Sequence, residues 1–87
     1  MTQTNWFRSR TPASLGSAIK ELREAAGETQ AQFARAIGSS RATVSRLERG
    51  ESVTSDVLFH ALARVRHEFA VIPRGSRLRV EAADAPN

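Results

Sequence analysis

The sequence contains no cysteine, and Lys20 is its only lysine. Without cysteine, disulfide bonds and thiolate metal sites are excluded, and the composition suits a reducing cytosol. No apolar run approaches the roughly 18 residues that a membrane-spanning helix needs. The first ten residues have no apolar stretch after their charges, so they do not resemble a secretory signal. We therefore expect a cytoplasmic protein without a membrane segment.

The chain has 87 residues and a formal net charge of +4 at pH 7. This length allows one small domain, whose core is marginal when it folds alone, so a homodimer is expected. Nearly all the basic residues are arginines, whose planar fork suits phosphate and guanine better than a lysine does. A genome rich in arginine codons explains their abundance equally well. The positions of the arginines therefore decide what they do.

The first helical pattern begins close to the N-terminus. Thr11 followed by Pro12 is typical of a helix N-cap and first helical residue. Apolar residues at helical spacing then predict a helix over residues 12–26, and Gly27 ends it. Its expected apolar positions are Leu15, Ile19, Leu22 and Ala26.

Two shorter helical patterns follow, joined by a tight turn. Thr29 and Gln32 form a T-x-x-Q capping box that opens the first of them. Gly38 closes it, because glycine readily adopts the positive φ that such a turn requires. Ser40 is the expected N-cap of the next helix, which Gly50 ends. The expected buried residues of the pair are Phe33, Ala34, Ala36, Ile37, Val44 and Leu47.

The pattern changes toward the C-terminus. A fourth helix is expected after a cap at Thr54 or Ser55. Residues 69–72 are then short, apolar and followed by Pro73, which predicts a β-strand. The alternating residues 78–80 are the alternative partner for that strand, in a hairpin within the same chain.

These patterns predict a mostly all-α fold of four to five helices with a short C-terminal β-strand. We divide the chain into a flexible arm (1–10), a helical domain (11–67), a C-terminal dimerisation strand or hairpin (68–81) and a disordered tail (82–87). An isolated two-stranded hairpin is marginally stable, and an exposed apolar edge needs cover. Pairing of the strand with its copy across a two-fold axis is therefore favoured over a hairpin within one chain.

The segment LGSAIKELREAAGETQAQFARAIGSSRATVSRLERGE resembles the DNA-binding domain of the phage repressor and Cro family, also called XRE-type regulators. The resemblance covers about residues 11–66. It implies a helix-turn-helix, in which the second helix lies in the major groove of double-stranded DNA. Ser39 departs from the family, which usually has a branched apolar residue there. The residues that carry the resemblance, all at the spacing the family has, are Thr29, Gln30, Ala34, Gly38, Val44, Ser45, Leu47, Glu48, Arg49 and Gly50.

The helix that follows Ser40 is the expected recognition helix. With Val44 and Leu47 directed inward, the remaining positions face outward, and residues near the N-terminus of a recognition helix reach base edges. Arg41 is the first candidate, because arginine can bind the O6 and N7 atoms of guanine together. The expected base-reading residues are Arg41, Ala42, Ser45 and Arg46.

Phosphate contacts are expected at helix N-termini, where free backbone N–H groups and the helix dipole favour anions. Ser40 and Thr43 lie at such a position, where simple capping is the alternative role. The family resemblance implies that Gln30 contacts the DNA backbone. It also implies a partly buried, structural salt bridge between Arg23 and Glu48. The expected phosphate-binding residues are Gln30, Ser40, Thr43 and Arg49.

The C-terminal half resembles HipB-type antitoxins, in which a helix leads directly into an apolar strand that pairs across the dimer. Arg66 departs from this group, which usually has glycine at the helix end. The resemblance implies an autoregulating antitoxin with a HipA-like kinase toxin as partner. A two-fold dimer presents recognition helices about 34–36 Å apart, so the operator should be an inverted repeat. The expected dimer-interface residues are Phe59, Phe69, Ala70, Val71 and Ile72.

Other classes of function fit the sequence less well. His60 and His67 are spaced wrongly for chelation of one metal ion and lack an evident third ligand, so neither a metal nor a cofactor is expected. No glycine-rich phosphate loop or Ser/His/Asp arrangement indicates an enzyme. A stand-alone or prophage-type regulator remains an alternative. So does a protein-binding adaptor that retains the fold, although the arginines grouped on the recognition helix argue against it.

Overall fold

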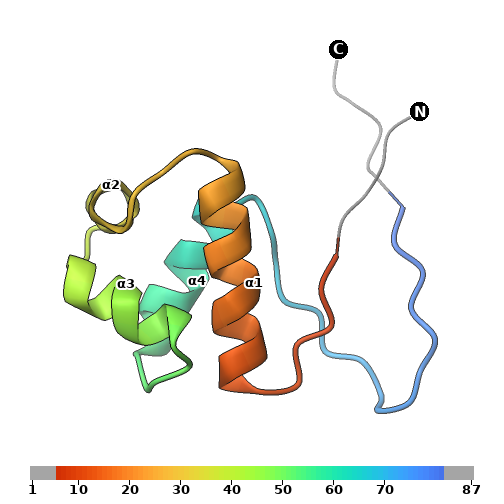
Figure 1. Cartoon of the computed structure of the whole chain (residues 1–87). Helices are drawn as coiled ribbons and strands as arrows, with labels where there is room; N and C mark the ends of the chain where they lie inside the picture. The colour runs from red at the N-terminus through yellow and green to blue at the C-terminus, as the bar shows by residue number, and fades with distance from the viewer. Residues whose placement is uncertain (1–5, 82–87) are drawn as a thin grey trace.

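The computed structural model describes residues 6–81, and four helices lie in that range (Figure 1). They are α1 (Pro12–Ala25), α2 (Gln30–Ala36), α3 (Arg41–Glu48) and α4 (Ser55–Arg64). Each helix falls where the sequence predicts one, with ends within a residue or two. The predicted disordered tail (82–87) and the first five residues of the predicted arm lie outside the described residues.

Every helix begins with a hydroxyl side chain that accepts a hydrogen bond from the backbone. The Thr29 hydroxyl accepts from the Gln32 N–H at 3.1 Å, and the Gln32 side chain accepts from the Thr29 N–H at 2.9 Å, so the predicted capping box is present. A second capping box, which the sequence analysis did not predict, joins Thr11 and Ser14. The other two N-caps are Ser40 and Thr54. These caps matter because α2 and α3 are too short to be stable as isolated helices.

The helices also share one way of ending. After each of the first three helices, a glycine with positive φ turns the chain, as Gly38 does between α2 and α3 with a φ of 68°. At the end of α4 the same place is taken by Arg66, with a φ of 60°. The His67 N–H then donates to the Leu62 carbonyl at 2.9 Å, which completes the helix end. An arginine therefore adopts a backbone conformation that favours glycine.

The core lies where the four helices meet. Phe33, Ile19 and Val44 are its largest fully buried side chains. The helical spacing of apolar residues predicted that these three side chains face the core. It also predicted this for Ala26 and Ala36, and that prediction is wrong, because both alanines are exposed. Both alanines lie close to the end of a helix, where the apolar stripe has already turned away from the core. The buried cluster consists of Ile19, Phe33, Ala34, Val44, Leu47, Ala61 and Leu62.

The C-terminal end of α3 packs directly against the backbone of α1. A Cβ atom at Gly16 would clash with the carbonyl oxygen of Leu47 and would lie 2.8 Å from that of Glu48. A Cβ atom at Gly50 would lie 2.6 Å from the Cα atom of Ala13. Two glycines thus let α1 approach α3 more closely than any side chain would allow. The sequence analysis gave Gly50 only the role of ending α3 and gave Gly16 none.

The segment after α4 has no regular secondary structure in residues 6–81, and that range contains no β-strand. It runs beside residues 6–10, on the side of α1 away from α3 (Figure 1). The Phe7 and His67 rings lie 6.2 Å apart there. The hairpin considered between residues 69–72 and 78–80 is therefore not formed in the single chain. Pairing across a two-fold axis requires a second chain and stays a prediction. No helix in the described part of the chain has the length and apolar character needed to cross a membrane.

Replacing Arg66 with glycine should stabilise the protein. Arg66→Gly removes the Cβ atom that disfavours positive φ, which is worth about 1 kcal/mol in the free energy of unfolding. Urea denaturation at a fixed protein concentration measures the change. Arg66→Ala is the matched control, because it removes the guanidinium but keeps the Cβ atom, and we expect it to change stability little. Equal stabilisation by both variants would show that charge, and not backbone conformation, is responsible.

Candidate nucleic-acid interface

The predicted base-reading residues lie on the outer face of α3. Arg41, Ala42 and Arg46 are exposed, and Ser45 is half-buried. Val44 and Leu47, on the opposite face of the helix, are buried in the core. Arg41 and Arg46 take part in none of the ion pairs that the structure shows among residues 6–81. Their guanidinium groups are thus available to an external partner.

The N-terminus of α3 is closed by its own side chains. The Ser40 hydroxyl accepts from the Thr43 N–H at 3.1 Å, and its oxygen lies 2.9 Å from the Thr43 hydroxyl. Ser40 is exposed and Thr43 is half-buried. Ser40 therefore caps α3, and the two hydroxyls stand next to the backbone N–H groups of the first turn, where an anion would approach.

Below this outer face, Arg23 of α1 and Glu48 of α3 form a buried ion pair. The Arg23 Nε atom donates to Glu48 Oε2 at 2.6 Å, and Nη2 donates to Glu48 Oε1 at 3.1 Å. The two residues are only 6% and 8% exposed. The hydrogen bonds that Arg23 donates to Glu48 are the main reason that the pKa of Arg23 is raised, and burial opposes this shift. A pair held by two parallel hydrogen bonds also fixes the relative orientation of its two helices.

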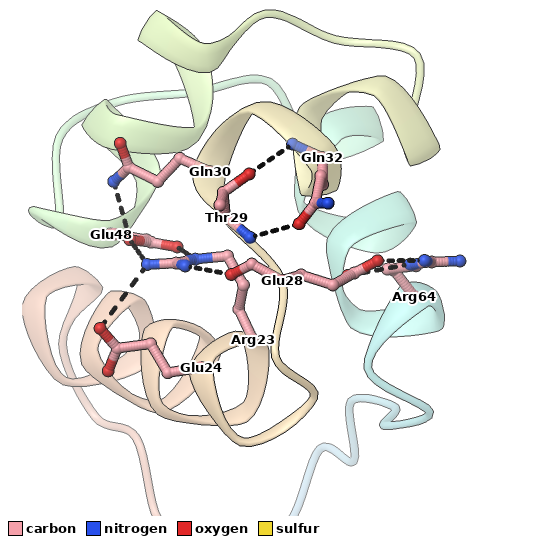
Figure 2. Close-up of polar contacts among 8 residues, drawn as sticks. All are labelled: Arg23, Glu24, Glu28, Thr29, Gln30, Gln32, Glu48 and Arg64. Atoms are coloured by element: carbon pink, nitrogen blue, oxygen red, sulfur yellow. Dashed lines mark hydrogen bonds and ion pairs between the residues drawn. The ribbon is translucent and has the colours of Figure 1, made fainter.

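The pair extends into a network that reaches the start of α2 (Figure 2). Arg23 Nη1 donates to the carbonyl oxygen of Glu28 at 2.6 Å, just before α2. The Gln30 amide donates to Glu48 Oε1 at 3.0 Å. The family resemblance implies a DNA backbone contact for Gln30, and in the structure the Gln30 amide supports the end of α3. Across the described residues, no buried side-chain nitrogen or oxygen lacks a hydrogen-bond partner.

A second ion pair joins the loop before α2 to α4. The Arg64 guanidinium donates to the Glu28 carboxylate through Nε, at 3.2 Å, and through Nη2. These hydrogen bonds lower the pKa of Glu28. The sequence analysis did not predict this pair, because the partners are far apart in the chain and neither belongs to a recognised motif.

Arg49 is held by partners within the chain. Its Nε atom donates to Glu51 Oε2 at 2.6 Å, and its Nη1 atom donates to the Ser45 hydroxyl oxygen. The Arg49 hydrogen bond lowers the pKa of Glu51. The sequence placed Arg49 among the phosphate-binding residues, but here its guanidinium connects the middle of α3 to the following loop.

The residues predicted at a dimer interface are exposed in the single chain. Phe59 of α4 is 57% exposed and Val71 is fully exposed. The Phe59 and Phe69 rings meet edge to face, with centroids 5.4 Å apart. Ala70 and Ile72 are also exposed. Phe59 and Phe69 thus form an exposed apolar contact between α4 and the segment after it, and further exposed apolar side chains follow Phe69 in the chain.

The two histidines considered as metal ligands do not come together at a site. His60 is exposed, and a ring nitrogen of His67 lies 2.7 Å from the carbonyl oxygen of Val65. Among the described residues, no group of three acidic or histidine side chains is placed to hold a metal ion.

Comparison with known proteins supports this arrangement. Residues 14–67 match a family model described as a helix-turn-helix domain. One similar solved structure is a HipB variant in complex with an O2 20-mer, with a TM-score of 0.72, 27% identity, and 80% and 99% of the two chains covered. Two others are a HipB–O4 20-mer complex and a HipA–HipB–O2–O3 complex, each with a TM-score of 0.71, 26% identity, and 79% and 99% covered. No curated protein matches the chain.

Removing one partner of the buried ion pair should strongly destabilise the protein. Arg23→Met leaves the Glu48 carboxylate buried without its counter-ion, which costs about 3–5 kcal/mol in the free energy of unfolding. Urea denaturation measures the loss. The double variant Arg23→Met/Glu48→Met removes both charges and should recover part of it.

The matched control is Glu24→Gln, which alters an exposed carboxylate 3.9 Å from the same guanidinium. Because exposed pairs contribute little, we expect only a small change. An Arg23→Met variant as stable as this control would contradict a structural role for the pair.

Proposed function

The chain belongs to the helix-turn-helix domain family, in its XRE type, and from this premise we propose that it is a sequence-specific, double-stranded DNA-binding transcriptional repressor. The observation that carries the proposal is the outer face of α3. Arg41 and Arg46 are exposed there and free of ion pairs within the described chain, on a helix whose far end is fixed by a buried network. A rigid helix with outward arginines suits the major groove.

In this proposal the residues on the outer face of α3 read the DNA bases. Arg41, in the first turn, can bind the O6 and N7 atoms of a guanine with both arms of its fork. Ala42 offers a methyl group to a thymine methyl. Ser45 and Arg46, one turn later, reach further base edges.

Phosphate contacts position the helix in the groove. Ser40 and Thr43 lie at the N-terminus of α3, where backbone N–H groups and the helix dipole attract an anion. Gln30, at the start of α2, has a half-buried side chain that donates to Glu48 and is proposed to contact the DNA backbone as well. Such contacts fix register without reading sequence.

A second copy of this chain is proposed to cover the apolar surface around Phe59 and Phe69. An exposed surface with two phenylalanines, a fully exposed Val71 and an exposed Ile72 is unusual for a protein that acts alone. In the proposed dimer, residues 69–72 pair with their copy as β-strands. The two α3 helices then enter successive major grooves about 34–36 Å apart, on an inverted-repeat operator.

The similarity to HipB extends the proposal to an antitoxin. Similar structures include HipB with 20-mers, which we interpret as operator DNA, and a complex that also contains HipA. We propose that this chain represses its own promoter in the cytoplasm and binds a HipA-like kinase toxin. Co-purification with the product of a neighbouring kinase gene tests the second part. A regulator that acts alone binds its operator and recovers no such partner.

Replacing Arg41 should weaken binding to the operator. Arg41→Ala removes a bidentate base contact worth about 1–3 kcal/mol and should relax the preference at one base pair of each half-site. Fluorescence anisotropy on the operator, first selected from a random duplex library, measures the affinity. The affinity of the unmodified protein should also fall steeply with salt, because phosphate contacts release counterions.

The charge-matched control is Lys20→Ala, which removes an exposed positive charge from α1, outside the proposed DNA-binding and dimer surfaces. It should leave operator affinity nearly unchanged. If Arg41→Ala weakens binding to the operator and to scrambled duplexes equally, Arg41 contacts phosphate and reads no base. If the unmodified protein enriches no sequence, the chain is not a sequence-specific repressor.

Removing the C-terminal segment should dissociate the dimer. Deletion of residues 68–87 takes away the proposed strand and part of the apolar surface, so dimerisation and operator binding should weaken together. Val71→Lys in the full chain is a milder variant, because it places a charge in the proposed interface. Sedimentation velocity at low micromolar concentration measures both. A truncated chain that remains dimeric would show that the strand does not form the interface.

A further inference from the structure

Ser45 stands between two arginines on one stripe of α3. Arg41, Ser45 and Arg49 follow one another at intervals of four residues, so their side chains lie along the same helix face. Arg41 makes no ion pair within residues 6–81, whereas Arg49 donates to the Ser45 hydroxyl oxygen. One lone pair of the Ser45 hydroxyl oxygen is therefore already engaged within the chain.

The position of Arg49 is itself fixed by Glu51. The Arg49 Nε atom donates to Glu51 Oε2 at 2.6 Å, while Nη1 remains directed at Ser45. Glu51 is held in place because the chain turns at Gly50, with a φ of 79°, and the Glu51 N–H then donates to the Arg46 carbonyl at 2.9 Å. The end of α3 thus positions a carboxylate that orients the arginine, which in turn holds the serine.

We propose that Arg49, positioned by Glu51, fixes Ser45 as a hydrogen-bond donor, so that α3 selects a base with an acceptor edge at this place. The preferred base is guanine, and the disfavoured base is cytosine. This inference rests on the proposed DNA-binding function and deepens it, since it assigns a base class to one position in each half-site.

The chemistry of the hydroxyl leads to this preference. A serine hydroxyl has one hydrogen to donate and two lone pairs that accept. Arg49 occupies a lone pair, and its positive charge disfavours any further approach by an amino group. In the major groove guanine presents the acceptors N7 and O6, whereas cytosine presents only its N4 amino group. Adenine and thymine each present one acceptor and are expected to rank between them.

A phosphate contact by Arg49 is the competing role. In that case the guanidinium leaves Ser45 and Glu51 and turns to the DNA backbone, which carries no sequence information directly. The two roles differ in what removal of the arginine does. Loss of a positioning residue changes the preference at one base, whereas loss of a phosphate contact weakens binding to all sequences alike.

The test compares operator selection by the full-length protein with selection by Arg49→Met and Ser45→Ala, using one random duplex library and sequencing. Arg49→Met keeps a long side chain but cannot donate to Ser45. We expect it to reduce the guanine-over-cytosine preference at one position per half-site by about two- to ten-fold, the range for loss of one hydrogen bond. Ser45→Ala should reduce the guanine-over-cytosine preference at the same position. The double variant should reduce it little more than either single variant does.

Glu51→Ala is the second variant, because it leaves both Arg49 and Ser45 in place but removes the carboxylate that orients the arginine. We expect a smaller loss at the same position. Lys20→Met is the control for removal of an exposed positive charge outside both proposed interfaces, and it should change the base preference at no position. Thermal melting checks that all variants fold.

The outcomes separate this inference from the proposed function. If the unmodified protein selects an operator and Arg49→Met alters no base position, or lowers affinity uniformly with a flatter salt dependence, the inference is overturned while DNA reading stands. If the unmodified protein selects no sequence, the proposed function fails, and the inference fails with it.

Discussion

The orientation of α3 depends on the buried ion pair between Arg23 and Glu48. A helix of eight residues is not stable alone, so tertiary contacts must define its direction. Those contacts gather at its C-terminal end, where the ion pair, the Gln30 amide and the close approach at Gly16 all meet. At its N-terminal end the helix is capped by Ser40, and Val44 in its middle is fully buried in the core. The helix is therefore held by its inner face and by the ion pair at its C-terminal end, while its outer face, with Arg41 and Arg46, stays exposed.

The acidic residues explain why some arginines are available and others are not. Glu48, Glu28 and Glu51 each pair with an arginine that connects two parts of the domain. Arg41 and Arg46, on the outer face of α3, have no acidic partner within residues 6–81. The modest net charge of the whole chain therefore understates the positive charge of this one surface. What matters for DNA is the local imbalance, because a nearby carboxylate repels phosphate and occupies the donors that would bind it.

The sequence predicts the features that depend on neighbours in the chain. The N-caps at Thr29 and Ser40, the turn at Gly38 and the inward positions of Phe33 and Val44 all follow from local spacing. Apart from the Arg23–Glu48 pair, which the family resemblance implied, the contacts between distant residues were found only in the structure. The sequence analysis gave Gly16 no role, because nothing local shows that the backbone of α3 approaches it. The pairing of Arg64 with Glu28, which lie 36 residues apart, likewise depends on the folded geometry.

The turn at Arg66 sets the path of the C-terminal segment, and the sequence did not predict this path. A non-glycine residue with positive φ is costly, yet it completes the helix end and sends the chain back toward α4, where Phe69 meets Phe59. The two rings still leave much of their surface exposed, so their contact does not by itself bury an apolar core. Phe59 of α4 and Phe69 of the following segment therefore leave an apolar surface exposed to solvent. We propose that a second copy of the chain covers this surface. A strand in residues 69–72 would gain hydrogen-bond partners from that same cover, because within residues 6–81 no backbone hydrogen bond reaches this segment.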